Sequence, residues 1–301
     1  MEFEKGGTSP LSRISKAGRK MRTCQKYVWA ASCALLATTV YWGPVARAAD
    51  AYFGTVGKLH MYLQSGSGTP VLNDFALGAD AAETTLSPNS MTGGTVAGPN
   101  LSATALVKSS TPGSPAWGYM ADYSTQASLD SAQPDGSYTL TLQGVHDGSH
   151  SSAPLSLTGD SYPSSPYVSN YPSLLTANVN AGFTVQWNSW TTGTSSDYIL
   201  LEIYDHTREG AYFSPWPGQA GVLTGTATSE SIPAGLVGNG DYFEIDLTFL
   251  HPVAIDTTSY SGVPLFAAYG AQTVLYVPEP ASLALIGVGA SAMLMRRRGR
   301  K

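Results

Sequence analysis

The side chains best suited to chemistry lie close together near the middle of the chain. In Gly159-Asp160-Ser161 a serine follows a carboxylate, and Asp147 precedes His150 by three positions. A serine, a histidine and a carboxylate could supply the nucleophile and base of acyl transfer. Such a nucleophile needs a rigid turn from strand to helix and donors for the oxyanion, and no long stretch of the chain has the helical period. We therefore predict no catalytic residue and expect the protein not to be an enzyme.

The string Gly159-Asp160-Ser161-Tyr162 resembles the nucleophile block of the Gly-Asp-Ser esterases, and this resemblance implies ester hydrolysis. In those enzymes an Asp-x-x-His block follows the serine by much of the domain, in an α/β fold. Here the corresponding block comes before the serine. A secreted hydrolase is therefore the weakest of three functional alternatives.

Imidazole and carboxylate groups at short spacing can also bind a metal ion. His146, Asp147 and His150 have this spacing, although a Gly-Ser turn at the end of a strand explains the segment more simply. Calcium would need a set of oxygen ligands, and no Asp-x-Asp-x-Asp-Gly loop is present. We expect no metal site and no cofactor, with weakly bound Ca²⁺ as the alternative at the acidic turn residues Asp122, Asp130, Asp135, Asp205 and Glu209.

Polysaccharide binding is a sharper non-catalytic alternative, because sugar rings stack their apolar faces on exposed aromatic side chains. Trp216 stands between two prolines in a predicted loop and is the best candidate, followed by Trp190 and Trp117. Trp187 alternates with apolar residues of a predicted strand and is expected in the core. We therefore predict that Trp216 contacts a glycan.

Strands must position these side chains, because alternation of apolar residues is the dominant pattern. Predicted strands cover residues 55–63, 101–108, 137–143, 183–187, 198–204, 242–250 and 265–276. Residues 66–98 are expected to form loops, with a short helical turn at 79–83. The fold class is therefore all-β, of the sandwich type. The predicted inward side chains are Tyr138, Leu140, Leu142, Phe183, Val185, Trp187, Ile199, Leu201, Ile203, Phe243, Ile245, Leu247 and Phe249.

Two similar segments divide the middle of the chain in two. A turn before Tyr138 is answered by a turn before Tyr242, 104 residues later, which is close to the length of one sandwich domain. The proline-rich residues 161–167 are typical of a stiff linker. We therefore predict two tandem β-sandwich domains, at residues 49–157 and 158–276.

The second predicted domain resembles a fibronectin type III or immunoglobulin-like sandwich. The residues that carry the resemblance are the strand at 183–187 with Trp187, and Tyr242 at the position of a tyrosine corner. The resemblance implies that the Tyr242 ring fills the edge of the core while its hydroxyl caps a backbone group. A proline-rich insertion at 214–218 and a long loop at 252–263 depart from the family and leave the strand count open.

Residues 1–48 have the composition of a signal peptide. An apolar stretch at 27–40 leads to Ala46-Arg47-Ala48, an A-x-A site at which signal peptidase would leave Ala49 first. Arg47 is atypical there, and Met21 is an alternative start. The basic residues before the apolar stretch are Lys16, Arg19, Lys20, Arg22 and Lys26.

Residues 277–301 combine three features in order. Pro278-Glu279-Pro280 keeps a helix from extending backwards, and an apolar run at 281–295 follows it. At about 1.5 Å per residue this run reaches roughly 22 Å, which is short of the ~30 Å hydrocarbon core of a membrane. The basic cluster that ends it should stay in the cytoplasm. This cluster includes Arg296, Arg297 and Arg298.

This order resembles the PEP-CTERM sorting signal of Gram-negative bacteria. The resemblance implies that an exosortase, a membrane transpeptidase-like enzyme, recognises Pro278, Glu279 and Pro280 and processes the chain nearby, in cells that make extracellular polysaccharide. The arginine cluster would be the stop and orientation signal. An ordinary tail anchor is the alternative, but it has no reason to carry Pro-Glu-Pro at that boundary.

Composition limits what the exported middle can do. Residues 49–276 hold 18 acidic side chains against three basic ones, which leaves a net charge of −15. Such a charge argues against nucleic acid or anionic lipid as a partner. Both cysteines, Cys24 and Cys33, lie in the predicted signal peptide, so disulfides and thiolate sites are excluded from the mature chain.

The sequence therefore predicts an exported structural or adhesive protein of the cell surface or extracellular matrix, with a transient anchor in the inner membrane. Its expected partners are signal peptidase and the general export machinery, the exosortase, and an exopolysaccharide. The alternatives are a lectin-like polysaccharide-binding module and a secreted hydrolase.

Overall fold

The structure, a computed structural model, describes residues 49–84, 89–110, 114–177, 181–207, 210–236 and 242–277. The predicted signal peptide before Ala49 and the predicted sorting residues after Val277 lie outside the described residues. Within the described ranges, no helix is long and apolar enough to cross a membrane.

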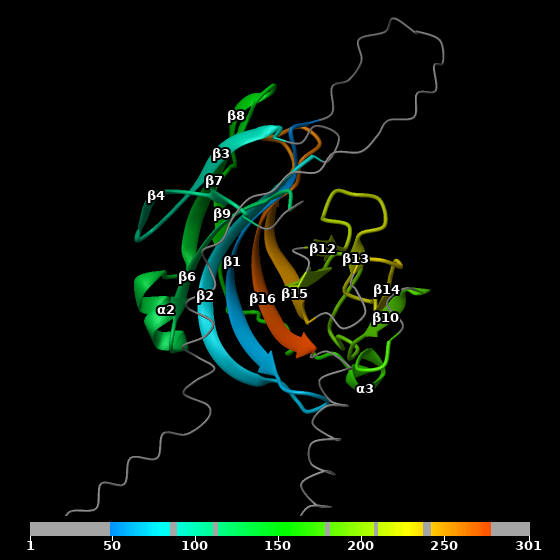
Figure 1. Ribbon diagram of the computed structural model, residues 1–301. Coiled ribbons are helices and arrows are strands. Elements are labelled where there is room, and N and C mark those ends of the chain that lie inside the picture. Colours follow the sequence, from blue (N-terminus) through cyan, green and yellow to red (C-terminus); the bar gives the residue numbers. More distant parts are fainter. Residues whose placement is uncertain are drawn as a thin grey trace, which may run out of the picture. The chain divides into compact units, whose positions relative to one another are not determined.

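The described chain is built almost entirely from strands (Figure 1). The strands are β1 (Ala51–Gln64), β2 (Val71–Glu83), β3 (Met91–Gly98), β4 (Leu101–Ala105), β5 (Val107–Lys108), β6 (Ala116–Tyr123), β7 (Gly136–Gly144), β8 (Gly148–Ser151), β9 (Leu155–Leu157), β10 (Phe183–Gln186), β11 (Tyr198–Asp205), β12 (Gly210–Phe213), β13 (Leu223–Thr224), β14 (Ser229–Ile232), β15 (Phe243–Asp256) and β16 (Leu265–Val277). The helices are α2 (Gln126–Ala132) and α3 (Tyr171–Leu174).

One large, strongly curved sheet organises the described chain. It has nine strands in the order β12-β11-β15-β16-β1-β2-β6-β5, with β13 paired to β11. At its centre β1 runs parallel to β16, and the other described pairings are antiparallel. A parallel pair needs a long connection between its strands, and here almost the whole folded chain provides it.

This pairing differs from the prediction of two tandem sandwiches. β1 belongs to the first predicted domain and β16 to the second, yet they pair over eleven residues, from Gly54 with Leu265 to Gln64 with Leu275. The described residues on both sides of residue 158 likewise belong to one compact unit. Strands from both sides of residue 158 therefore share one sheet, and residues from both sides, such as Leu140 and Leu265, pack in the same core.

The predicted linker at residues 161–167 is packed onto this sheet. The ring of Tyr162 stacks on His60 of β1 with 3.7 Å between ring centroids. The carbonyl of Pro166 accepts a hydrogen bond from the hydroxyl of Thr273 on β16. Prolines here hold an extended segment against the sheet.

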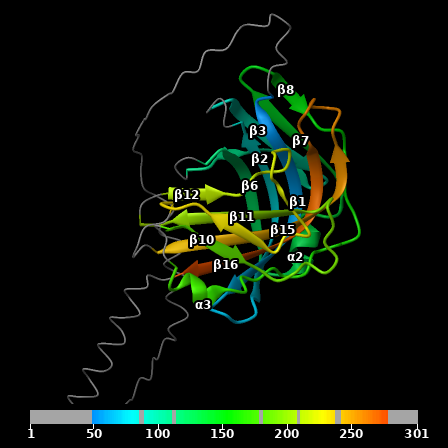
Figure 2. The ribbon, with the colours of Figure 1, turned by 90° about the vertical axis from the view of Figure 1, so that its right-hand side faces the viewer.

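Two smaller sheets cover one face of the large one (Figure 2). A five-stranded sheet, β4-β3-β7-β8 with β9 on β7, packs on β1, β2 and β16 around a core that contains Val56, Leu77 and Leu140. The pair β10-β14 and helix α3 cover β11 and β15 around a second core that contains Trp187 and Leu247. The all-β class and the sandwich-like layering predicted from the sequence are confirmed.

Alternation predicted the buried faces of β7, β10, β11 and β15, although the predicted inward residue Phe183 is only partly buried. Tyr138, Leu140, Leu142, Val185, Trp187, Ile199, Leu201, Ile203, Phe243, Ile245, Leu247 and Phe249 are all buried. The prediction for residues 66–98 is wrong, because this stretch contains β2 and β3, and the helical turn expected at 79–83 is part of β2. β2 is central and covered on both faces at Ala76 to Ala79, so it does not alternate.

The tyrosine-corner geometry occurs at a different tyrosine from the one predicted. The ring of Tyr242 is 36% exposed and stacks on Tyr276. Tyr138 is fully buried instead, and its hydroxyl donates a hydrogen bond to the carbonyl of Pro134 at 2.9 Å. This hydrogen bond therefore holds the turn at Pro134 against the start of β7.

Candidate functional site

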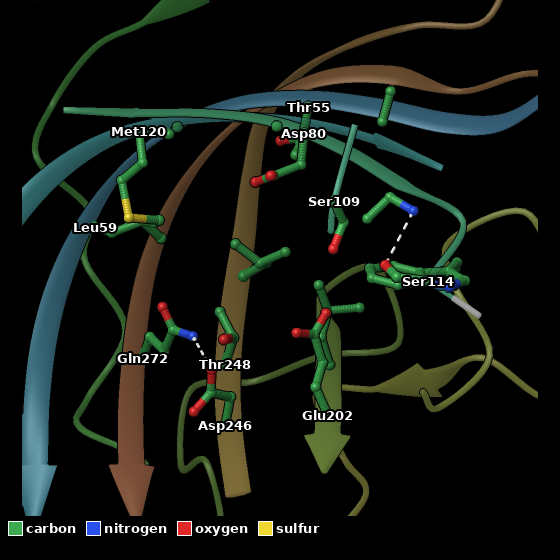
Figure 3. Close-up of a pocket in the computed structure, with 18 of the residues that line it drawn as sticks. Thr55, Leu59, Asp80, Ser109, Ser114, Met120, Glu202, Asp246, Thr248 and Gln272 are labelled. Atoms are coloured by element: carbon green, nitrogen blue, oxygen red, sulfur yellow. Dashed lines mark hydrogen bonds between the residues drawn. The ribbon is translucent and has the colours of Figure 1, made fainter. Parts of the chain in front are cut away.

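The face of the large sheet opposite the two main cores has a cavity of about 330 Å³ (Figure 3). Its walls come from the residues of β1, β2, β6, β11 and β15 that alternate with the core residues. On β11, Leu201 and Ile203 enter the core while Glu202 faces the cavity. We call this cavity the acidic cleft, after the side chains of Asp80, Glu202 and Asp246 that converge on it.

Glycines on neighbouring strands create the hollow. Gly57 of β1 pairs with Gly78 of β2, and Gly118 of β6 pairs with Asp80. A Cβ on Gly57 would lie 2.6 Å from the carbonyl oxygen of Ala268, and one on Gly118 would lie 2.7 Å from Asp80 Oδ1. The absence of side chains at these positions leaves space above the sheet and room for the Asp80 carboxyl.

The three carboxyl groups of the cleft resist ionisation. Burial, with a contribution from the charge of Glu202, raises the pKa of Asp80 to about 7. Burial also raises the pKa of Glu202, although a hydrogen bond from the Tyr204 hydroxyl opposes it. The pKa of Asp246 is raised well above its ordinary value by burial and by the charges of Glu244 and Glu202. The carboxyls thus repel one another in a poorly hydrated space.

Polar groups beside these carboxyls are only partly satisfied. Gln272 on β16 donates from Nε2 to Asp246 Oδ2 at 3.3 Å. Thr55, the register partner of Asp80 on β1, is 6% exposed, and its hydroxyl oxygen has no hydrogen-bond partner in the described part of the chain. A buried hydroxyl without a partner costs free energy, so Thr55 marks a place for a ligand atom.

The two lysines of the described residues form ion pairs with carboxylates outside the acidic cleft. Lys58 lies on the core face of β1, where its ammonium group is 2.8 Å from carboxylate oxygens of Asp130 and Asp135. Lys108 is 2.6 Å from Glu83. Among the described cleft-lining residues there is no lysine, arginine or histidine, so the carboxyls there have no counter-charge from the described chain.

Trp216 lines the acidic cleft, but its ring is not exposed as a glycan platform, contrary to the expectation from its loop position. It is 6% exposed and stacks on Phe53 at 5.3 Å and on Phe213 at 5.7 Å between centroids. Trp190 is also buried, stacked on Phe249. Trp117 is partly buried, with the Lys108 ammonium group 5.6 Å from its ring centroid. The proline-flanked tryptophan is a loop anchor that packs on β1.

The residues considered for acyl transfer lie in different settings. Ser161 is exposed on a turn that follows Asp160, a residue with φ of 47°. The ring of His150 stacks on Tyr260, and its nitrogens lie 3.3 and 3.1 Å from the carbonyl oxygens of Ser259 and Asp147. The described contacts of His150 are therefore with backbone carbonyls and an aromatic ring.

The remaining metal candidates take part in a network that holds the start of β1. His146 Nδ1 is 2.8 Å from Asp50 Oδ1, and the Asp50 amide donates to Asp147 Oδ2 at 2.7 Å. Burial opposes ionisation of Asp50, but hydrogen bonds from His146 and Asp147 outweigh it and lower the pKa of this carboxyl. Across the described ranges, no group of three or more His, Cys, Asp or Glu side chains is arranged to hold a metal ion.

The acidic cleft was not identified from the sequence, although a signal was present. Glu202 and Asp246 occupy the outward positions of two predicted strands, as exposed acidic residues do. Only the pairing of β1 with β16, which joins β1 and β2 to β15 and β11 in one sheet, shows that these outward faces surround one cavity. The sequence pattern of a solvated strand face and that of a half-buried cleft are the same.

Comparison with known proteins gives one match. Residues 277–300 match the family model described as the PEP-CTERM protein-sorting motif. A search of curated proteins finds no match to the chain. The matched region contains Pro278-Glu279-Pro280 and the arginine cluster, and it begins at Val277, the last residue of β16. The chain therefore carries a PEP-CTERM sorting signal and is an exported protein that an exosortase recognises.

Proposed function

We propose that the protein is a non-catalytic structural or adhesive component of the cell surface or extracellular matrix that holds polysaccharide in its acidic cleft. The sorting motif at residues 277–300 is the observation that carries the location. The cleft supports the binding role, since its volume is within the range of ligand pockets, about 300–1,000 Å³.

Delivery follows from the two ends of the chain. Signal peptidase removes residues 1–48 after Ala48, so that Ala49 is the first residue of the mature chain. Asp50 supports this boundary, because it is 3% exposed and its backbone amide is bonded to Asp147 and Tyr260.

Exosortase then acts at Pro278, Glu279 and Pro280 while the apolar run holds the tail in the inner membrane. The arginine cluster stops transfer and orients the chain. Val277, the first residue of the matched motif and the residue before Pro278, is fully buried in the second core. Processing on the C-terminal side of Val277 would therefore leave the fold intact at the outer surface or in the matrix.

The cleft has the groups that sugars use. Sugar hydroxyls donate hydrogen bonds to carboxylates and accept them from amides and hydroxyls. Asp80, Glu202 and Asp246 supply the acceptors, and Gln272 and Thr248 supply groups that can donate. Apolar contact comes from Met120, which is 48% exposed at the cleft.

Retention on native polysaccharide tests this proposal. The mature protein should bind to extracellular polysaccharide isolated from the same cells, and Glu202→Gln should weaken retention by about tenfold, since hydrogen bonds to charged groups contribute about 1.5–3 kcal/mol. Asp122→Asn is the matched control, because this carboxyl is exposed on β6 and loses the same charge. Equal retention of all three proteins would contradict the assignment to the cleft.

A secreted glycan hydrolase is the alternative with a specific observation behind it. Asp80, with a pKa of about 7, faces the same cavity as Glu202, and glycosidases use a protonated and an ionised carboxyl group together. Turnover of matrix polysaccharide that disappears in Asp80→Asn would establish this alternative. The non-catalytic proposal predicts that reducing ends do not accumulate with either protein.

A further inference from the structure

We propose that the ligand of the acidic cleft is a polysaccharide that carries protonated amino groups, such as a polymer of glucosamine. This inference rests on the proposed polysaccharide-binding function and specifies the class of sugar. It comes from the charges of the cleft and from the position of Thr55.

A cationic ligand and a neutral sugar would change the repulsion between the cleft carboxylates differently. Asp80 faces the cavity from β2, Glu202 from β11 and Asp246 from β15, and no described lining residue is basic. Besides burial, the charge of Glu202 makes ionisation of Asp80 and of Asp246 harder. An ammonium group among them removes this repulsion, whereas a neutral sugar leaves it in place.

The hydrogen-bonding groups of the cleft also favour an ammonium group, independently of their charge. An ammonium group has three N–H donors and no acceptor, so its site must consist of acceptors. Thr55 Oγ1 is a buried acceptor without a described partner, and Thr55 is the register partner of Asp80, a second acceptor. Gly118 opposite Asp80 leaves the space into which this carboxyl extends. The two side chains together form a small acceptor site at one wall of the cleft (Figure 3).

A bare metal ion fits less well. The carboxyls come from three separate strands, and none of the described carboxylate groupings meets the geometry of a metal site. An ammonium group tolerates longer and less regular contacts than Ca²⁺, which needs six to eight oxygen ligands at about 2.3–2.6 Å. The net charge of −15 over residues 49–276 would in addition attract a polycation from a distance.

Calorimetry on the mature protein recovered from cells tests the inference. The probes are a glucosamine hexamer, the fully N-acetylated hexamer and a glucose hexamer, which differ at the amino position. We expect the glucosamine hexamer to bind at least tenfold more tightly than the other two, and its affinity to fall as salt is added. Binding should release protons, which is measured by repeating the titration in buffers of different ionisation enthalpy.

The pH dependence has a defined sign. Below a pH of about 7 Asp80 takes up a proton, and Glu202 and Asp246 have raised pKa values as well, so the cleft loses negative charge on acidification. Glu244, the Tyr204 hydroxyl and Tyr276 are further titratable groups on the described strands around them, and burial with the charges of Glu244 and Asp246 raises the pKa of Tyr276. Affinity for the glucosamine hexamer should therefore rise with pH as long as its amino groups stay protonated, and should fall once they lose their protons.

Isosteric variants separate the cleft from general surface charge. Asp246→Asn and Glu202→Gln should each weaken glucosamine binding about tenfold or more, while Asp122→Asn should leave it within twofold. Both cleft variants should stay folded, with thermal midpoints at or above that of the parent, because each removes a carboxyl that is costly to ionise.

The outcomes are distinguishable. Equal binding of the three hexamers would overturn the requirement for amino groups and leave the polysaccharide-binding proposal standing. Binding of glucosamine alone with an unchanged affinity in the cleft variants would overturn the assignment to this cleft. Failure of all three hexamers and of the native polysaccharide to bind would contradict both this inference and the proposed function.

Discussion

Charged side chains on the two faces of β1 and β2 differ in whether they are paired with an opposite charge. On the core face, Lys58 is 1% exposed and holds Asp130 and Asp135, which joins α2 and the entry of β7 to the sheet. On the cleft face, Asp80 has a raised pKa and an unpartnered neighbour, Thr55. The first arrangement stabilises the fold, and the second is a cost that a ligand can offset.

Lys58→Ala should destabilise the protein strongly. It leaves two carboxylates beside the core without their cation, and we expect a loss of about 2–3 kcal/mol in the free energy of unfolding, below the 3–5 kcal/mol of a fully buried pair because both carboxylates are about a third exposed. Urea unfolding of parent and variant measures the difference.

The matched control for Lys58 removes all three charges of the two ion pairs. Lys58→Met combined with Asp130→Asn and Asp135→Asn should recover most of the lost stability, since no unpaired charge remains. A single Lys58→Ala variant as stable as its parent would show that the two ion pairs do not hold α2 and β7 in place.

Asp80→Asn should change the pH dependence of stability. The folded-state pKa of about 7 lies above the ordinary value of 3.8, so the native state binds more protons than the unfolded state between these values. Stability contributed by this group is therefore lost as pH rises from about 4 to about 7. Above pH 7 the variant should be more stable than its parent by roughly 1–2 kcal/mol, less than the full shift implies because the side chain is partly open to solvent.

Denaturant unfolding of both proteins at a series of pH values measures this difference. The two curves should converge on the acid side, where Asp80 is protonated in both states. A constant difference across the whole range would mean that Asp80 ionises normally in the folded protein.

At the scale of elements, β16 connects the fold to its sorting signal. It lies between β15 and β1 near the centre of the large sheet, and its last residue, Val277, is the first residue of the motif. A central strand is an unusual place for a processing signal, because its removal would expose both neighbours. The sorting enzyme must therefore act without unpairing Val277 from Phe243.

Truncation at the two ends of this strand should give different results. A chain that ends at Val277 keeps every described contact of the core and should unfold cooperatively near the temperature of the longer protein. A chain that ends at Gly270 lacks Leu275 and Val277, both fully buried, and should fail to fold. The loss of a buried leucine alone costs about 2–5 kcal/mol, which is a large part of the total stability of a protein. Circular dichroism melting curves compare the two, and cooperative unfolding of the shorter chain would contradict the role of β16.

Comparison of strands shows what the sequence could and could not predict. β7, β11 and β15 alternate because one face of each is in a core and the other is not, and their inward residues were predicted correctly. β2 has both faces covered in the middle of the sheet, so its small apolar residues gave no period of two. α2 was missed because it has only seven residues. It begins at a Thr125–Ser128 capping box, a weak local signal.

The candidate site divides in the same way. The sorting signal depends on local order along the chain, and the sequence was sufficient to identify it. The acidic cleft depends on β1 meeting β16, a pairing of residues more than 200 positions apart that no local pattern encodes. The same pairing explains why two apparent sandwich halves form one sheet.

At the scale of the whole molecule, the chain consists of a folded acidic body between a predicted signal peptide and a PEP-CTERM sorting signal. Its strong negative charge is suited to an exported protein that meets a polymer outside the cell. The account therefore depends on removal of both signals during export.

Intact mass spectrometry of the protein recovered from the surface or medium of its own cells tests this most directly. The account predicts a chain that begins at or within a few residues of Ala49, retains Val277 and lacks Arg296 to Arg298, and it predicts that replacing Pro278 and Pro280 by alanine leaves the tail attached. Recovery of the chain with Met1 and Lys301 both present, or the same C-terminus in parent and variant, would contradict it.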